Sequence, residues 1–142
     1  MRAQRLTHLL LALTALVSAG SGCRTRATHD EPARAGVGFE LPGTGPVARG
    51  AILTQPPGHE EVFVPYVAVG ATSWVAACHD EAGTTPPLFS FETDAGGGLR
   101  AAADPGLTPR DRCLAAHAVS GAPPAGLPAQ TRITVQLALR AP

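Results

Sequence analysis

The residues with the greatest chemical capacity in this chain of 142 residues are three cysteines, Cys23, Cys78 and Cys113. A thiol can be acylated, ligate a metal or pair as a disulfide, and in an oxidising compartment thiols are expected in even numbers. Cys78 and Cys113 form no CxxC motif, and no neighbour in the sequence would activate either thiol. We therefore predict a structural disulfide between them, with free thiols or a redox pair as the alternatives.

The first 22 residues have the composition of an export signal. Arg2 and Arg5 give a positive start, Leu6–Val17 is apolar, and Ser18–Gly22 is a small-residue run of the kind that signal peptidases accept. A membrane-spanning helix needs about 20 apolar residues, so this segment is too short to span and no later stretch qualifies. We expect residues 1–22 to be a signal peptide and the chain to be exported.

The end of this signal, Gly20-Ser21-Gly22-Cys23, resembles the lipobox of bacterial lipoproteins. The resemblance implies that Cys23 carries a diacylglyceryl group and fatty acyl chains such as palmitate, which would tether the chain to a membrane. Gly20 departs from the pattern, which usually has an aliphatic residue there, so cleavage without lipidation is the alternative. Arg24, where an Asp would favour the inner membrane, implies the outer membrane, facing the periplasm or the cell surface.

Histidine and carboxylate side chains cluster at His59-Glu60-Glu61 and His79-Asp80-Glu81, and neither cluster has a metal-ligand spacing such as HExxH. His79 and His117 could meet if two helices pack together. A small metal-dependent hydrolase that uses His59, His79 and His117 is therefore kept as a second alternative. No serine lies in a nucleophile motif. We expect no enzyme activity, no resident metal and no cofactor.

The charged residues argue against a nucleic-acid partner. All 11 basic residues are arginines, they are scattered along the chain, and they are balanced by 11 acidic residues. Such a distribution produces no basic patch or steering field. Loss of Arg2 and Arg5 with the signal would leave the chain mildly acidic.

The composition changes after Gly50. Residues 23–50 are rich in Gly, Pro, Ala and Arg, which predicts a flexible tether with at most one short strand at Val37–Leu41. Residues 51–142 are expected to form one small domain. The β-branched runs Ala51–Thr54 and Glu61–Val69 predict strands, the second at a sheet edge or irregular because it contains Pro65.

Two helices are expected in this domain. In the first, Thr72 or Ser73 would form the N-cap, Trp74 and Cys78 would share one face, and Gly83 would end the helix. Trp74 is interpreted as a core residue. The second begins with the strongest start signals in the chain, a capping Thr108, a proline at the first helical position and Asp111 two positions later. It would carry Cys113 and end at Gly121.

Strand signals surround the second helix. Leu88–Glu92 and Leu99–Ala103 predict a hairpin whose turn is Asp94–Gly98. Thr131–Arg140 alternates apolar and polar residues, as a half-buried strand does. The order helix, hairpin, helix, strand predicts an α+β domain with an antiparallel sheet, in which the disulfide would contribute about 3–4 kcal/mol by the loop-entropy estimate. An Ig-like β-sandwich is the alternative fold, although Trp74 precedes the first cysteine of the pair instead of following it.

Over residues 71–139 this order resembles the TonB C-terminal-like domains of cell-envelope proteins, in their two-cysteine, energy-transducer and gliding-associated versions. The matching segments are Cys78-His79-Asp80-Glu81-Ala82, Pro87-Leu88, Asp94 to Gly98, Arg112-Cys113-Leu114, Pro123-Pro124-Ala125-Gly126 and Ile133 to Leu139. The hairpin is shorter than in the family, and Val119-Ser120-Gly121 replaces its usual aromatic residue, so the resemblance is to a reduced member.

The resemblance implies a protein-interaction module whose strands can pair with a partner's edge. The expected function is therefore that of a non-enzymatic, lipid-anchored envelope protein, whose partners are a membrane, through Cys23, and an unknown envelope protein. A secreted structural β-sandwich domain is the alternative.

Overall fold

The computed structural model describes residues 36–141, which form five strands and two helices in one small α+β domain. In chain order the elements are β1 (Val37–Glu40), β2 (Val47–Gln55), α1 (Glu60–Ala77), β3 (Leu88–Thr93), β4 (Leu99–Ala101), α2 (Pro109–Ser120) and β5 (Arg132–Leu139). The α+β prediction is confirmed. The β-sandwich alternative is wrong, because Cys78 ends a helix and Cys113 lies within one.

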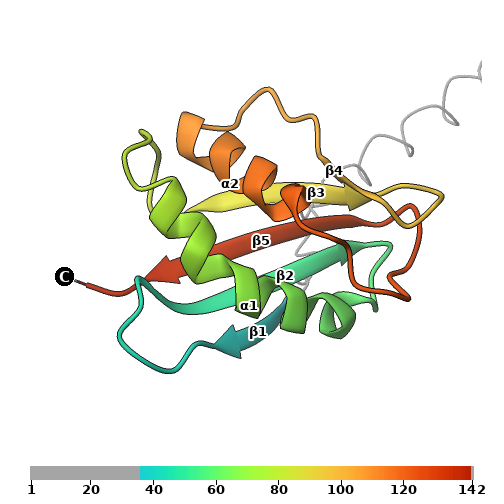
Figure 1. Cartoon of the computed structure of the whole chain (residues 1–142), viewed down its shortest axis with the longest axis horizontal. Coiled ribbons are helices and arrows are strands. Elements are labelled where there is room, and N and C mark those ends of the chain that lie inside the picture. The colour runs from blue at the N-terminus through green and yellow to red at the C-terminus, as the bar shows by residue number, and fades with distance from the viewer. Residues whose placement is uncertain (1–35, 142) are drawn as a thin grey trace, which may run out of the picture. The chain divides into compact units, whose positions relative to one another are not determined.

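The five strands form one antiparallel sheet in the order β1-β2-β5-β3-β4. The last strand of the chain therefore lies in the middle of the sheet, between β2 and β3. Both helices cover the same face of the sheet (Figure 1). Within residues 36–141, β1 and β4 are therefore the edges of the sheet and its opposite face is uncovered.

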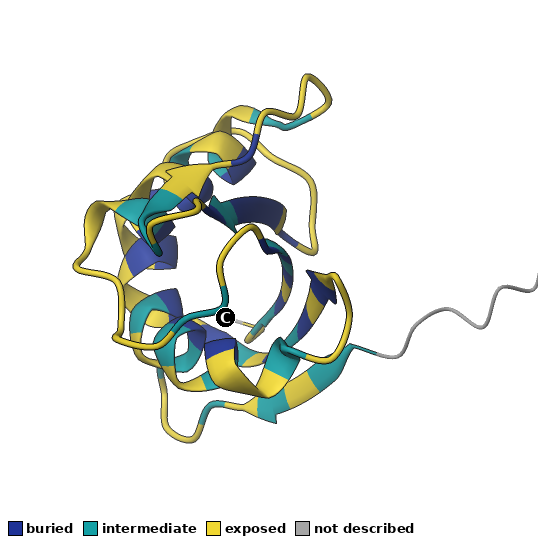
Figure 2. Ribbon diagram, turned by 90° about the vertical axis from the view of Figure 1, so that its right-hand side faces the viewer, coloured by how far each residue is buried: buried dark blue, intermediate teal, exposed yellow. Residues whose placement is uncertain are grey.

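The core lies between the helices and the sheet, where buried positions on both surfaces face one another (Figure 2). Alternate residues of β5 supply one part of it: Ile133, Val135 and Leu137 are fully buried. Phe91 of β3 meets Phe63 of α1 edge to face, with ring centroids 6.3 Å apart. The predicted apolar face of Thr131–Arg140 is thus confirmed.

The second predicted helix is confirmed at both ends. Thr108 is the N-cap, and its hydroxyl accepts a hydrogen bond from the backbone N–H of Asp111 at 3.2 Å. Gly121 is the C-cap. The predicted hairpin is also present, since Asp94 and Gly98 close the turn between β3 and β4 with a backbone hydrogen bond of 2.9 Å.

The short strand predicted at Val37–Leu41 is present as β1, but the flexible tether predicted to run to Gly50 is wrong, because residues 47–50 form the first part of β2, which pairs with β1. Phe39 is the physical reason. It pairs with Gly50 across the two strands, and a Cβ atom on Gly50 would lie 2.3 Å from the Phe39 ring. Gly50 therefore makes room for an aromatic ring that packs against the core. Residues 23–35 lie outside the described residues.

The prediction for Glu61–Val69 is wrong, because this segment is helical and α1 begins at Glu60, not at Thr72 or Ser73. Its β-branched residues and Pro65 disfavour a helix locally. Burial against the sheet outweighs this preference, because Phe63, Val67 and Ala71 recur every four residues and are fully buried. Pro65 lies near the start of the helix on its exposed side.

Gly83 was predicted to end the first helix, but the C-cap is Cys78, whose N–H donates to the Trp74 carbonyl at 3.0 Å. Gly83 has a different role. A Cβ atom there would lie 2.8 Å from Cβ of Arg110, so glycine lets the loop after α1 approach the start of α2. Neither of the two described helices combines the length and the apolar character needed to cross a bilayer.

Candidate functional site

Of the three predicted cysteine sites, the structure describes two. Cys78 and Cys113 form a disulfide with their Cα atoms 5.9 Å apart, as predicted. The bond joins the C-terminal end of α1 to the first half of α2, and Cys78 is fully buried. Both thiols are therefore used in holding the two helices together. Cys23 lies outside the described residues.

The predicted histidine trio does not form a metal site. His59 is the N-cap of α1 and His79 follows its C-cap, so a helix of 18 residues separates them. At 1.5 Å per residue that helix is roughly 27 Å long, far beyond the reach of shared coordination. His117 instead lies beside the disulfide: its ring nitrogen and the two sulfur atoms are within 4.8 Å of one another. His59, His79 and His117 therefore cannot bind one metal ion together.

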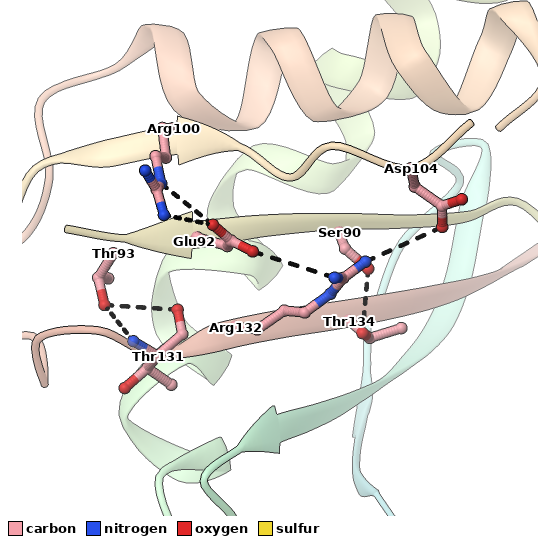
Figure 3. Close-up of polar contacts among 8 residues, drawn as sticks. All are labelled: Ser90, Glu92, Thr93, Arg100, Asp104, Thr131, Arg132 and Thr134. Atoms are coloured by element: carbon pink, nitrogen blue, oxygen red, sulfur yellow. Dashed lines mark hydrogen bonds and ion pairs between the residues drawn. The ribbon is translucent and has the colours of Figure 1, made fainter. Parts of the chain in front are cut away.

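Charged side chains gather on the open face of the sheet, where they pair with one another (Figure 3). Arg100 donates to the Glu92 carboxylate from Nε at 3.0 Å and lies 2.9 Å from it through Nη2. Arg132 lies 4.0 Å from Glu92 and 3.9 Å from Asp104. Each charge in this row has an opposite charge beside it, and because these pairs are partly exposed they contribute little to stability.

A groove of about 540 Å³ opens between α1 and the C-terminal end of α2. Its α1 wall contains Val62, Pro65, Tyr66, Val69, Gly70 and Trp74. Its other wall contains His117, Ser120, Gly121, Ala122 and Pro124. Most of the exposed surface in the groove is apolar, which distinguishes it from the polar hollow beside Glu92 and Arg132.

The sequence of α1 explains why apolar side chains are exposed to solvent in the groove. Val62, Pro65 and Val69 are spaced as neighbours on one side of a helix, next to the side that carries the buried Phe63 and Val67. Val69 is 84% exposed and Val62 47%. An apolar stripe of this width is more than the core requires, and large exposed apolar patches mark interaction sites.

Two aromatic rings form the floor of the groove. Tyr66 and Trp74 lie with ring centroids 5.7 Å apart, and Trp74 is 8% exposed. The Tyr66 hydroxyl donates a hydrogen bond to the carbonyl oxygen of Ala118 on α2. Burial disfavours the phenolate and raises the pKa of Tyr66 above its ordinary value of 10.0. The floor of the groove therefore carries no charge at neutral pH.

The electrostatics of the groove favour an uncharged ligand. Within the described part of the chain, none of its lining residues is Asp, Glu, Lys or Arg. The α1 wall has as polar side-chain groups only the Tyr66 hydroxyl, which is bonded to Ala118, and the Trp74 indole N–H, whereas the other wall has the His117 ring, the Ser120 hydroxyl and the exposed residues Gly121 and Ala122. A charged group placed here would lose its hydration and gain no partner of opposite charge.

The edges of the sheet are a weaker candidate for binding a partner than the groove. The strands of the domain were expected to pair with a partner's edge, but the final strand β5 is already paired on both sides, with β2 and with β3. The edges are β1, with 4 residues, and β4, with 3. Strands this short offer few backbone hydrogen bonds to an added strand.

The groove was missed in the sequence because its main wall was assigned to a strand. Trp74 was interpreted as a core residue, and the structure confirms this while also placing part of the ring in the groove. The spacing of Val62, Pro65 and Val69 carries the missing signal, since it places these residues side by side only on a helix.

Comparisons with known proteins identify no relative of this chain. No protein-family model matches the chain, and searches of curated proteins and of solved structures find no similar protein.

Proposed function

We propose that this protein is a non-enzymatic, lipid-anchored protein of the bacterial cell envelope, whose domain binds an apolar segment of another envelope protein. The observation that carries the proposal is the groove between α1 and α2, where Val62 and Val69 are exposed beside Trp74. The Cys23 lipobox and the signal before it support the location, on the outer membrane and facing the periplasm or the cell surface. The resemblance to TonB C-terminal-like domains supports an interaction role.

The proposed occupant is an uncharged stretch of polypeptide. One wall supplies apolar side chains, and the other supplies the backbone of Gly121 and Ala122 together with the Ser120 hydroxyl. A peptide matches both walls, because it has apolar side chains and backbone groups that form hydrogen bonds. An acyl chain would match only the first wall. The short sheet edges make addition of a partner strand a weaker alternative.

Site-specific photo-crosslinking in intact cells tests the proposal. A photoreactive residue at position 69 is expected to give an adduct with one envelope protein, identified by mass spectrometry. The matched control is position 53, because Leu53 is 37% exposed and lies on β2, outside the groove. Identical adducts from both positions, lipid adducts only, or no adduct at position 69 would contradict a protein partner in the groove.

Lipid anchoring is tested separately by the intact mass of the protein isolated from membranes. Loss of residues 1–22 with added diacylglyceryl and acyl mass is expected for the native chain. Cys23→Ser should abolish the added mass and release the protein from the membrane. Cleavage without added lipid would contradict the anchor and leave the groove proposal standing.

A further inference from the structure

The disulfide has a third potential ligand beside it. Cys113 and His117 are four residues apart on α2, so their side chains lie on the same side of the helix. Cys78 reaches the same place from the end of α1. The two sulfur atoms and a His117 ring nitrogen all lie within 4.8 Å of one another.

We infer that reduction of the Cys78–Cys113 disulfide converts this cluster into a zinc site with two thiolate ligands and one imidazole ligand. Zn–S and Zn–N bonds of about 2.3 and 2.1 Å place tetrahedral ligands roughly 3.5–3.8 Å from one another. Three ligand atoms already within 4.8 Å therefore need only small side-chain movements once the S–S bond has opened. Two sulfur ligands and one nitrogen ligand suit zinc better than calcium or magnesium, which prefer oxygen.

The chemistry balances in two steps. A dithiol reductant gives two electrons and two protons to the S–S bond, which yields two thiols on the protein and leaves the reductant as a disulfide. Zinc then binds the two sulfur atoms and the neutral imidazole, and both thiol protons pass to solvent. The charge of the metal is cancelled by the two thiolates.

The oxidised protein cannot hold the ion in this way, because disulfide sulfur is not a thiolate. His117 also lines the apolar groove, so a zinc ion at this site would have water in its fourth position at the edge of that groove. The site is therefore controlled by the redox state and touches the proposed binding surface, although it does not depend on the groove having a partner.

The inference is tested by titrating the full chain with Co²⁺ under anaerobic conditions. Cobalt is used as a coloured substitute for zinc. After treatment with a phosphine reductant, which leaves no competing thiol, the protein should bind one Co²⁺ ion per chain and show thiolate-to-cobalt absorption. Excess Zn²⁺ should remove the colour. The oxidised protein should bind none. Less than one ion per reduced chain, or equal binding by oxidised protein, would overturn the inference.

Two histidine variants separate a built site from loose capture by two thiols. His117→Gln should weaken cobalt binding by at least the ~10–100-fold that even an outer-shell change costs in a metal site. His79→Gln is the matched control, because His79 adjoins Cys78 yet its Nδ1 donates to the Ala76 carbonyl and its Nε2 pairs with Asp80. Equal binding by the two variants would overturn the assignment of His117. Far-UV circular dichroism must show that α1 and α2 persist after reduction, since binding by an unfolded chain would overturn it too.

Discussion

The two helices lie on the same face of the sheet, but they are held by different interactions. At the start of α2, Thr108 donates to the Asp111 carboxylate at 2.7 Å, and the same carboxylate accepts from the Leu88 backbone N–H of β3 at 3.2 Å. Helix α1 has no side-chain bond at its N-cap, His59, and contains Pro65. It depends on the apolar side chains that it buries, such as Phe63 and Val67.

The position of α2 in the sequence is set by the residues at its own start. Helix α1 is instead stabilised by its packing against the rest of the domain. The polar start of α2 fixes its first residue. Helix α1 needs only its buried side to be apolar, so its other side is free to carry Val62 and Val69 into the groove. The apolar wall of the proposed binding groove is thus on the helix whose stability comes from packing.

The largest expected effect tests the dependence of α1 on burial. Phe63→Ala removes a fully buried ring that contacts Phe91, and it should lower the free energy of unfolding by about 3–5 kcal/mol. Val69→Ala, on the exposed side of the same helix, should change it by less than about 0.5 kcal/mol. Urea denaturation followed by circular dichroism measures both. Similar losses in the two variants would refute the division of α1 into a structural and a free side.

The next effect tests the polar start of α2. Asp111→Ala removes the bond with Thr108 and leaves the Leu88 N–H without its partner, which together should cost about 2 kcal/mol. Asp80→Ala is the control, because Asp80 is an exposed aspartate that pairs with the exposed His79. A loss at Asp111 no greater than at Asp80 would show that α2, like α1, is held by packing.

Tyr66 links the two helices and is the only tyrosine in the chain, so its ionisation can be followed by absorbance. Burial raises its pKa above 10.0, so the midpoint should lie above 10.0 in the folded protein and return to about 10 in urea. The associated stability is complete below the unfolded pKa and is lost as pH rises through the folded pKa. Tyr66→Phe should cost about 1 kcal/mol. An unshifted midpoint would mean that this contact between α1 and α2 is open in solution.

The smallest effect concerns the start of α1. The backbone N–H of Glu60 itself, and then those of Thr54 and Gly58, donate to the Glu60 carboxylate and hold its pKa below 4.5. The stability from Glu60 should therefore be present above pH 4.5 and be lost as pH falls through the folded pKa.

Glu60→Gln should lower the melting temperature slightly at neutral pH and converge with the wild type in acid. Glu61→Gln, one residue along, is the control. A difference between Glu60→Gln and the wild type that is the same at every pH would show that the carboxylate charge does not stabilise this turn.

The comparison of the helices also explains which parts of the fold could be predicted. The start of α2 is predicted by its own residues, Thr108, Pro109 and Asp111. Strand β5 is predicted by the alternation of Ile133, Val135 and Leu137 with polar residues. Helix α1 could not be predicted over Glu61–Val69, because its own residues favour a strand and only the sheet beneath them makes the helix stable.

The pairing of β1 with β2 and the groove also depend on residues that are distant in the sequence. Gly50 suggests a flexible segment until Phe39, a distant residue, is known to lie over it. The disulfide was predictable from the number of cysteines. The groove was not, because it depends on α1, on α2 and on the loop that contains Ala122 and Pro124.

The central position of β5 determines when the sheet can form during synthesis or export of the chain. Without residues 132–139, β1–β2 and β3–β4 are two separate hairpins with no strand to join them. A chain that emerges from a ribosome or a translocation channel in the order of its sequence cannot close this sheet until its fifth strand has emerged. Closure therefore waits for the last part of the domain, and until then the apolar inner faces of both hairpins remain open to chaperones.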